Sequence, residues 1–144
     1  LQGFKPKATL SYGANGLIET LTRFDEGGSV ILSYVYDARN RPIEIIGSDG
    51  SKITLVYNAS GDLVRKQQGD QWQEYEYTDR GDLRVVANSY GSTSYAHSSD
   101  GQIETITSSR GNTSLAYFPN GRLKSIAFAD GSTHQYHYNA LGLR

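Results

Sequence analysis

The 144-residue chain has no cysteine and no methionine, and only 3 prolines and 1 tryptophan. The absence of cysteine excludes disulfides, thiol catalysis, zinc fingers and iron–sulfur sites. It does not indicate the cellular compartment. No apolar run is long enough to span a bilayer, and no charged-then-apolar leader opens the chain. Because Leu1 stands where a start methionine would, we expect the chain to be a piece of a longer polypeptide.

The charge of the chain is balanced, with 14 basic and 15 acidic residues and a net charge of −1. Charges of one sign form no block anywhere in the sequence. Nucleic acid binding needs a concentrated cationic footprint, so we expect no nucleic acid partner, and we expect no membrane insertion.

Glycine (16) and tyrosine (11) are abundant instead, and they recur with a fixed period. Two residue types that tolerate a positive φ angle, glycine and asparagine, mark the repeat at intervals of mostly 20 or 21. This first series is Gly16, Asn40, Gly61, Gly81, Gly101, Gly121 and Gly142. A second series, about ten residues out of phase, is Gly50, Gly91, Gly111 and Gly131. Two turns per repeat predict two strands per repeat.

Each repeat reads Tyr-x-Tyr-Asp/Asn, two residues, Gly, a polar residue, then Leu or Ile. The copies are "LSYGANGLIETL" (10–21), "YVYDARNRPIEI" (34–45), "LVYNASGDLVRK" (55–66), "YEYTDRGDLRVV" (75–86), "YAHSSDGQIETI" (95–106), "LAYFPNGRLKSI" (115–126) and "YHYNALGLR" (136–144). They divide one array, 1–144, into units of approximately 8–28, 29–50, 51–71, 72–91, 92–111, 112–131 and a truncated 132–144.

The unit predicts a β-hairpin. Residues two apart on a strand share a face, so the paired tyrosines form an aromatic stripe. Glycine or asparagine then reverses the chain, and an aliphatic anchor starts the second strand. The predicted anchors are Ile43, Leu63, Leu83, Ile103 and Leu123. A second apolar residue often follows three places on, which predicts a bulge, a twist, or a sheet covered on both sides.

The tripeptide Arg80-Gly81-Asp82 is also found in adhesion proteins, but the repeat accounts for it. Gly81 is the turn glycine, and its two neighbours occupy variable polar positions. An adhesive role at an exposed hairpin tip stays open as an alternative.

Six copies in register, together with a worn first copy at 10–21, resemble the YD repeat of Rhs and teneurin-type proteins over residues 10 to 144. The sequence departs from that pattern at Asp62 and Asp82, which replace the usual Arg, and at His97, which replaces the second Tyr. The resemblance implies tandem hairpins that wind into a hollow shell. In bacterial members, which are secreted or surface-exposed, the shell encloses a C-terminal toxin. Animal members are adhesion proteins, and some repeats have been suggested to bind carbohydrate.

No set of residues has the pattern of a catalytic site, so we expect no enzymatic activity, no cofactor and no metal. His134 and His137 are three apart on a predicted strand and point to opposite faces, while His97 is interpreted as a polar substitute in the tyrosine stripe. The fragments "SDGS" at 48 and "ADGS" at 129 lack the further acidic ligands of a calcium loop and predict tight turns.

An aromatic surface is the remaining candidate site. Tyrosines with nearby Asp, Asn and Gln could stack on sugar rings, or they could simply pack against the next hairpin. The candidate ligand-binding residues are Trp72, Tyr75, Tyr77, Tyr136 and Tyr138.

The sequence therefore predicts an all-β protein of about thirteen short strands, with tandem antiparallel hairpins in a twisted, spiralling strip that forms part of a shell or barrel wall. We expect a non-catalytic wall segment of a secreted or surface-exposed protein whose partner is the rest of that polypeptide or its toxin cargo. The alternative is a carbohydrate-binding or cell-adhesion module. Exposed edges expected at Leu10 to Tyr12 and at Tyr136 to Tyr138 predict self-association.

Overall fold

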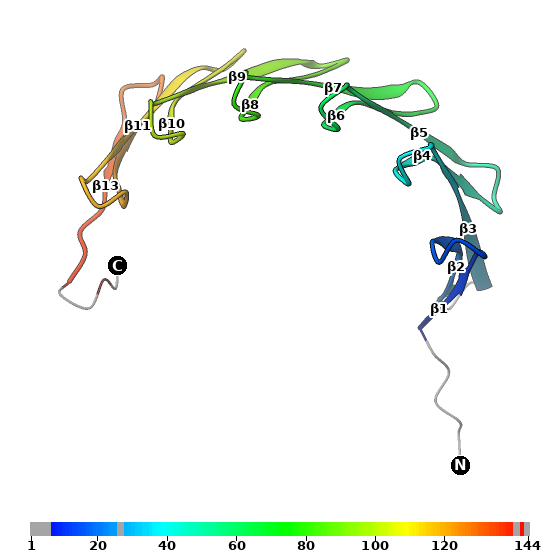
Figure 1. Ribbon diagram of the computed structural model, residues 1–144. Coiled ribbons are helices and arrows are strands. Elements are labelled where there is room, and N and C mark those ends of the chain that lie inside the picture. The colour runs from blue at the N-terminus through cyan, green and yellow to red at the C-terminus, as the bar shows by residue number, and fades with distance from the viewer. Residues whose placement is uncertain (1–6, 26–27, 140–141, 143–144) are drawn as a thin grey trace. The chain divides into compact units, whose positions relative to one another are not determined.

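The computed structural model describes residues 7–25, 28–139 and 142, and every regular element in these residues is a β-strand (Figure 1). The thirteen strands confirm the predicted all-β class. They are β1 (Ala8–Tyr12), β2 (Ile18–Asp25), β3 (Gly28–Tyr36), β4 (Pro42–Gly47), β5 (Lys52–Tyr57), β6 (Leu63–Gln68), β7 (Gln71–Tyr77), β8 (Leu83–Asn88), β9 (Gly91–His97), β10 (Ile103–Ser108), β11 (Gly111–Tyr117), β12 (Leu123–Ala127) and β13 (Thr133–Gln135).

The order of the strands in the sheet is their order in the sequence, from β1 to β13. Neighbouring strands pair antiparallel, as consecutive hairpins require. The chain divides into two compact units, Leu1–Gln73 and Glu74–Arg144. Strands β1 to β6 belong to the first unit, β8 to β13 belong to the second, and β7 includes the boundary. In the described residues, no helix is long and apolar enough to cross a membrane.

The chain reverses at the glycine positions that the repeat predicts. In the six tips from Gly16 to Gly121, two backbone hydrogen bonds close the turn; for example, the Thr78 N–H donates to the Asp82 carbonyl at 2.8 Å, and the Gly81 N–H donates to the Thr78 carbonyl at 2.9 Å. The turn residue has a positive φ, which glycine adopts without steric cost. The φ angles are 76° at Gly16, 62° at Asn40, 104° at Gly61, 87° at Gly81, 82° at Gly101, 80° at Gly121 and 75° at Gly142.

A β-bulge in the second strand of the hairpin explains the spacing of three between apolar residues. Ala116 pairs with Ser125, but the next residue, Tyr117, pairs with Leu123, so Lys124 is an extra residue. The extra residue brings Leu123 and Ile126 to the same face of the sheet. The same register shift occurs between β1 and β2, β3 and β4, β5 and β6, and β9 and β10.

The registers correct two expectations. Pro42, and not Ile43, pairs with the second tyrosine of its repeat, Tyr36, because Ile43 is the extra residue of that bulge. The last strand is Thr133–Gln135, so the predicted edge at Tyr136 to Tyr138 lies beyond it. The backbone still continues the pairing for one residue, since the Tyr136 N–H donates to the Lys124 carbonyl at 2.9 Å.

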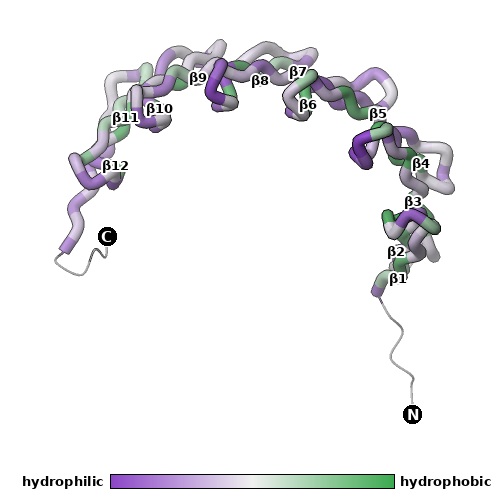
Figure 2. Tube along the Cα trace, viewed as in Figure 1, coloured by the Kyte–Doolittle hydropathy of each residue, from purple (hydrophilic) through white to green (hydrophobic). Residues whose placement is uncertain are grey.

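The sheet has two chemically different faces. The tyrosine face carries the paired tyrosines and the aliphatic residues opposite them, such as Leu115 opposite Ile126. The reverse face carries the alternate residues of each strand. The described part of the chain contains no fully buried hydrophobic side chain, because each face is covered only by its own side chains. Several loops are hydrophilic, and much of the apolar sequence lies in strands (Figure 2).

Candidate functional site: the tyrosine face and the hairpin tips

The second tyrosine of a repeat binds the repeat before it. The Tyr117 hydroxyl donates a hydrogen bond of 2.8 Å to the carbonyl of Ile103, the residue that begins the second strand of the preceding hairpin. Other second tyrosines make the equivalent bond. These are Tyr36 to the Ile18 carbonyl at 2.8 Å, Tyr57 to the Pro42 carbonyl at 2.9 Å and Tyr138 to the Leu123 carbonyl at 3.0 Å. We call this series the hydroxyl ladder.

His97 interrupts the hydroxyl ladder. It pairs with Ile103 in the register that Tyr117 has with Leu123, so it occupies the position of a second tyrosine, as predicted. Its imidazole has no phenolic hydroxyl, and its buried Nδ1 atom has no hydrogen-bond partner. A buried polar atom without a partner lowers stability, so we expect this repeat interface to be weaker than one that carries a tyrosine.

The Asp or Asn that follows the tyrosine pair caps the hairpin tip. Asp37 Oδ1 accepts hydrogen bonds from the Arg39 N–H at 2.8 Å and the Arg41 N–H at 3.0 Å. Its Oδ2 accepts one from Arg41 Nε at 2.8 Å. The backbone and side-chain hydrogen bonds from Arg41, with a smaller contribution from Arg39, lower the pKa of Asp37 from its ordinary value. Asn58, Thr78 and Ser98 cap the next tips in the same way.

Neighbouring tips are also joined to each other. Arg39 donates to the Ala59 carbonyl at 2.9 Å in the next tip of the first unit. In the second unit, Gln102 Nε2 donates to the Gly121 carbonyl at 3.1 Å. In both cases a polar side chain of one tip satisfies a backbone acceptor about one repeat further on.

The Arg80-Gly81-Asp82 tripeptide belongs to this system of tip contacts. Arg80 donates to the carbonyls of Ser98 at 2.9 Å and Ser99 at 2.5 Å. Its guanidinium also lies 3.4 Å from the Asp82 carboxylate. The side chains that a receptor would read are therefore used within the repeat array, which supports the structural interpretation of the tripeptide.

The two Asp-Gly-Ser fragments form tight turns of the second series. Asp49 Oδ1 accepts the Ser51 N–H at 2.9 Å, and Asp130 Oδ1 accepts the Ser132 N–H at 2.9 Å. Hydrogen bonds from the serine hydroxyl and then the serine backbone lower the pKa of each aspartate. Among the described residues, no three His, Asp or Glu side chains are grouped so that they could hold a metal ion.

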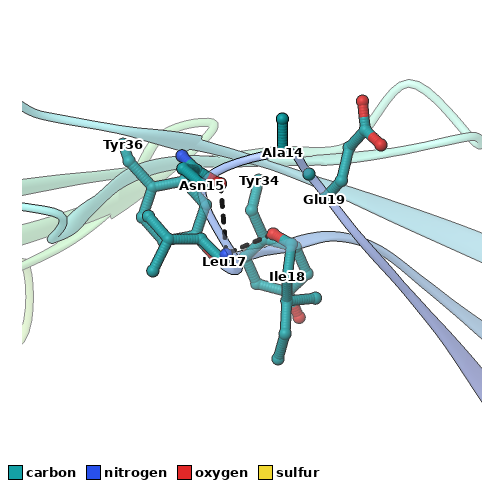
Figure 3. Close-up of a pocket in the computed structure, with 8 residues that line it drawn as sticks. Ala14, Asn15, Leu17, Ile18, Glu19, Tyr34 and Tyr36 are labelled. Atoms are coloured by element: carbon teal, nitrogen blue, oxygen red, sulfur yellow. Dashed lines mark hydrogen bonds between the residues drawn. The ribbon is translucent and has the colours of Figure 1, made fainter.

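Shallow depressions lie between a hairpin tip and the first strand of the next hairpin. One, of about 340 Å³, is lined by Asn15 and Leu17 of a tip, by Glu19 of β2, and by Tyr34 and Tyr36 of β3. In Figure 3 the Tyr36 ring lies beside Asn15 and Leu17 of that tip. Equivalent depressions of about 360 and 750 Å³ include Tyr57 and Tyr117. The recurrence shows that they follow from the repeat and are not one specialised pocket.

The predicted ligand-binding residues do not share one environment. Trp72 is half-buried in the first unit, where the Arg65 guanidinium lies 5.7 Å from its ring centroid. Arg65 pairs with Val56, so both are on the reverse face. Tyr138 is in the second unit, where Phe118 packs against its ring edge and Arg122 lies 5.4 Å from its ring centroid.

Tyr75, Tyr77 and Tyr136 are also in the second unit, and all three are half-buried. A site that used the whole predicted set would need residues from both units. Sequence reasoning missed the hydroxyl ladder and the tip-to-tip hydrogen bonds. The recurrence of a second tyrosine in most repeats was the available signal, and it does not identify the acceptor, which lies 14 to 18 residues earlier.

Comparison with known families finds a match to the teneurin YD-shell over residues 7–144. No curated protein matches the chain. Among solved structures, the crystal structure of TcdB2-TccC3-Cdc42 has a TM-score of 0.75 at 16% identity and covers 92% of this chain. TcdB2-TccC3 without its hypervariable C-terminal region has a TM-score of 0.77 at 16% identity and the same coverage.

A mutant of the Photorhabdus luminescens Tc holotoxin pore is similar at a TM-score of 0.58 and 13% identity, covering 92% of this chain. At such low identity, the TM-scores establish a shared fold alone. The chain spans 8% of the length of the two TcdB2-TccC3 chains and 10% of the holotoxin chain.

Proposed function

The chain belongs to the teneurin YD-shell family, and on that premise we propose that it is a non-catalytic wall segment of a larger secreted or surface-exposed protein. In this role its hairpins form part of a shell that encloses or presents a C-terminal toxin or effector. Its partners are the remainder of the same polypeptide and that cargo.

The hydroxyl ladder is the observation that carries this proposal. Tyr36, Tyr57, Tyr117 and Tyr138 use their most polar atom to bind the preceding hairpin. The tip side chains Arg39, Arg80 and Gln102 are used in the same way. When the recurring polar groups of an array serve its own neighbour contacts, the array is built to be continuous, as a wall requires.

Protease protection in the parent polypeptide tests this role. The parent is expressed with its natural C-terminal segment, and the digestion rate of that segment is compared with and without Tyr117→Asp, which places a charge at a repeat interface. We expect the segment to be protected in the parent and digested faster in the variant. Equal digestion of the segment in the parent and as a free fragment would contradict enclosure.

A carbohydrate-binding or adhesive module is the second candidate, favoured by the stacked Arg65 and Trp72 on the reverse face. Aromatic rings with adjacent polar groups bind the apolar faces of sugars. A glycan array with the wild type, Trp72→Ala and Tyr77→Ala separates the candidates. The wall role predicts no glycan signal, whereas the module predicts a signal that Trp72→Ala removes.

A further inference from the structure

Exposed apolar side chains are concentrated on the reverse face of the first unit. They are Phe24 (43% exposed), Ile31 (41%), Val35 (39%), Ile46 (37%) and Val56 (45%). We call these five residues the reverse-face patch. They account for five of the nine large hydrophobic side chains that are exposed in the described part of the chain.

The strand registers make four residues of the reverse-face patch continuous and place Val56 beyond Glu44. Ile46 pairs with Ser33, so it is diagonal to both Ile31 and Val35 on the neighbouring strand. Phe24 pairs with Ser29 and is diagonal to Ile31. On the other side, Glu44 pairs with both Val35 and Thr54, and Val56 follows Thr54 on the same face.

The repeat itself does not require this patch. In the second unit, the position of Ile46 within its repeat is occupied by Ala87, Thr107 and Ala127, and the position of Val35 is occupied by Glu76, Ala96 and Ala116. Pairing partners on that face are also small and polar, as in Thr105 with Ser114. Hairpins of the same fold therefore form with mostly smaller side chains on the reverse face, where Val85 pairs with Ser94, so the fold does not require the large apolar residues of the first unit.

We propose that the reverse-face patch is the interface of a face-to-face dimer with a second copy of this chain. A sheet is stable when its apolar face is buried against another layer, and the described residues contain no buried hydrophobic side chain. In a two-fold dimer each copy supplies the layer that the other lacks. On this face Lys52 Nζ lies 2.6 Å from Glu44 Oε1, so this ion pair is neutralised within one copy, and Arg65 lies beside the patch because it pairs with Val56.

The size of the face indicates a weak dimer. Five strands, β2 to β6, at about 4.8 Å spacing and about 20 Å of length give roughly 480 Å² of projected face per copy. Two copies bury roughly 960 Å² if the face is treated as flat. Specific, stable interfaces bury at least about 1,200 Å², and weaker, transient interfaces bury less. Such an interface forms with a dissociation constant in roughly the micromolar range.

Sedimentation velocity of the full chain from roughly 1 to 200 µM tests the proposal. The wild type is expected to shift from monomer to dimer over this range. Ile46→Lys should raise the dimer dissociation constant at least about tenfold, because it places a charge at the centre of an apolar interface. Thr107→Lys is the matched control, because Thr107 has the same repeat position and face in the second unit. This substitution should leave the dimer dissociation constant unchanged.

Ile46→Thr is a milder variant that we expect to fold. It introduces the β-branched residue found at the equivalent position of the second unit, Thr107. It should weaken the dimer while the far-UV circular dichroism stays that of the wild type. A wild type that is monomeric throughout the range overturns the proposal. So does a dimer that persists in Ile46→Lys, which would indicate pairing through the edge strand β1, and so does an equal effect of Thr107→Lys.

Discussion

Replacing His97 with tyrosine should stabilise the protein by completing the hydroxyl ladder. His97 occupies the position of a second tyrosine, and its Nδ1 atom is buried without a hydrogen-bond partner. A tyrosine there would direct its hydroxyl to the Leu83 carbonyl, as Tyr117 does to the Ile103 carbonyl at 2.8 Å. The substitution therefore adds one hydrogen bond and removes one unpartnered atom.

The expected gain follows from the net value of one hydrogen bond. A neutral intramolecular hydrogen bond contributes about 0.5–1.5 kcal/mol, so we expect His97→Tyr to raise the free energy of unfolding by about 1 kcal/mol. For a protein of this size a change of about 1 kcal/mol corresponds to a Tm increase of roughly 2–4 °C. Equilibrium unfolding in urea measures it as a higher midpoint with an unchanged m-value.

His97→Phe is the control that isolates the hydroxyl. Phenylalanine supplies the same ring without the donor, so the difference between the two variants measures the hydrogen bond alone. Native-state hydrogen exchange gives a local readout, because slower exchange should be confined to β8, β9 and β10. If His97→Phe stabilises as much as His97→Tyr, ring packing is responsible and the hydroxyl ladder contributes nothing.

Three further predictions concern single contacts. Tyr117→Phe should lower the free energy of unfolding by about 1 kcal/mol in urea denaturation, because it removes the bond to Ile103; an unchanged midpoint would show that this hydroxyl is satisfied equally by water. Gly81 has a φ of 87°, so Gly81→Ala should cost about 1–2 kcal/mol, measured by thermal unfolding, and Gly81→Asn should cost less, since Asn40 adopts a φ of 62°. In the folded protein the pKa of Asp37 is below its ordinary value, because Arg41 donates backbone and side-chain hydrogen bonds to it. The stabilisation that Asp37 contributes is therefore complete above its pKa in the unfolded chain and is lost as the pH falls through its pKa in the folded protein. Asp37→Asn should make the free energy of unfolding less dependent on pH in acid titrations. An identical pH profile in wild type and variant would show that the hydrogen bonds to Asp37 do not stabilise the fold.

The sequence predicted the hairpins because their determinants are local. A positive φ at a turn needs glycine or asparagine, and these residues occur with a regular period that can be counted. The spacing of three between Leu123 and Ile126 predicted an irregularity, and the register identifies it as a bulge. The anchor at Ile43 was wrong because proline at 42 did not fit the consensus, although it occupies the paired position.

The contacts between hairpins could not be predicted in the same way. The Tyr-x-Tyr spacing places two rings on one face, but it does not say which atom the hydroxyl meets 14 to 18 residues earlier. That partner depends on the bulge, which sets the register at the carbonyl of Ile103. The ligand-binding set remains a prediction, and its division between two units depends on long-range contacts that no local pattern encodes.

The abundance of tyrosine follows from the absence of a core. A two-layered domain buries leucine and isoleucine and gains most of its stability from that burial. Here no described hydrophobic side chain is fully buried, so each repeat must be held by contacts with its immediate neighbours. Tyrosine suits this arrangement because its ring packs along the sheet while its hydroxyl binds the next hairpin. Replacing the tyrosines with leucine would keep the apolar area but remove the bond that joins one hairpin to the next, so aliphatic residues alone would not build the same array.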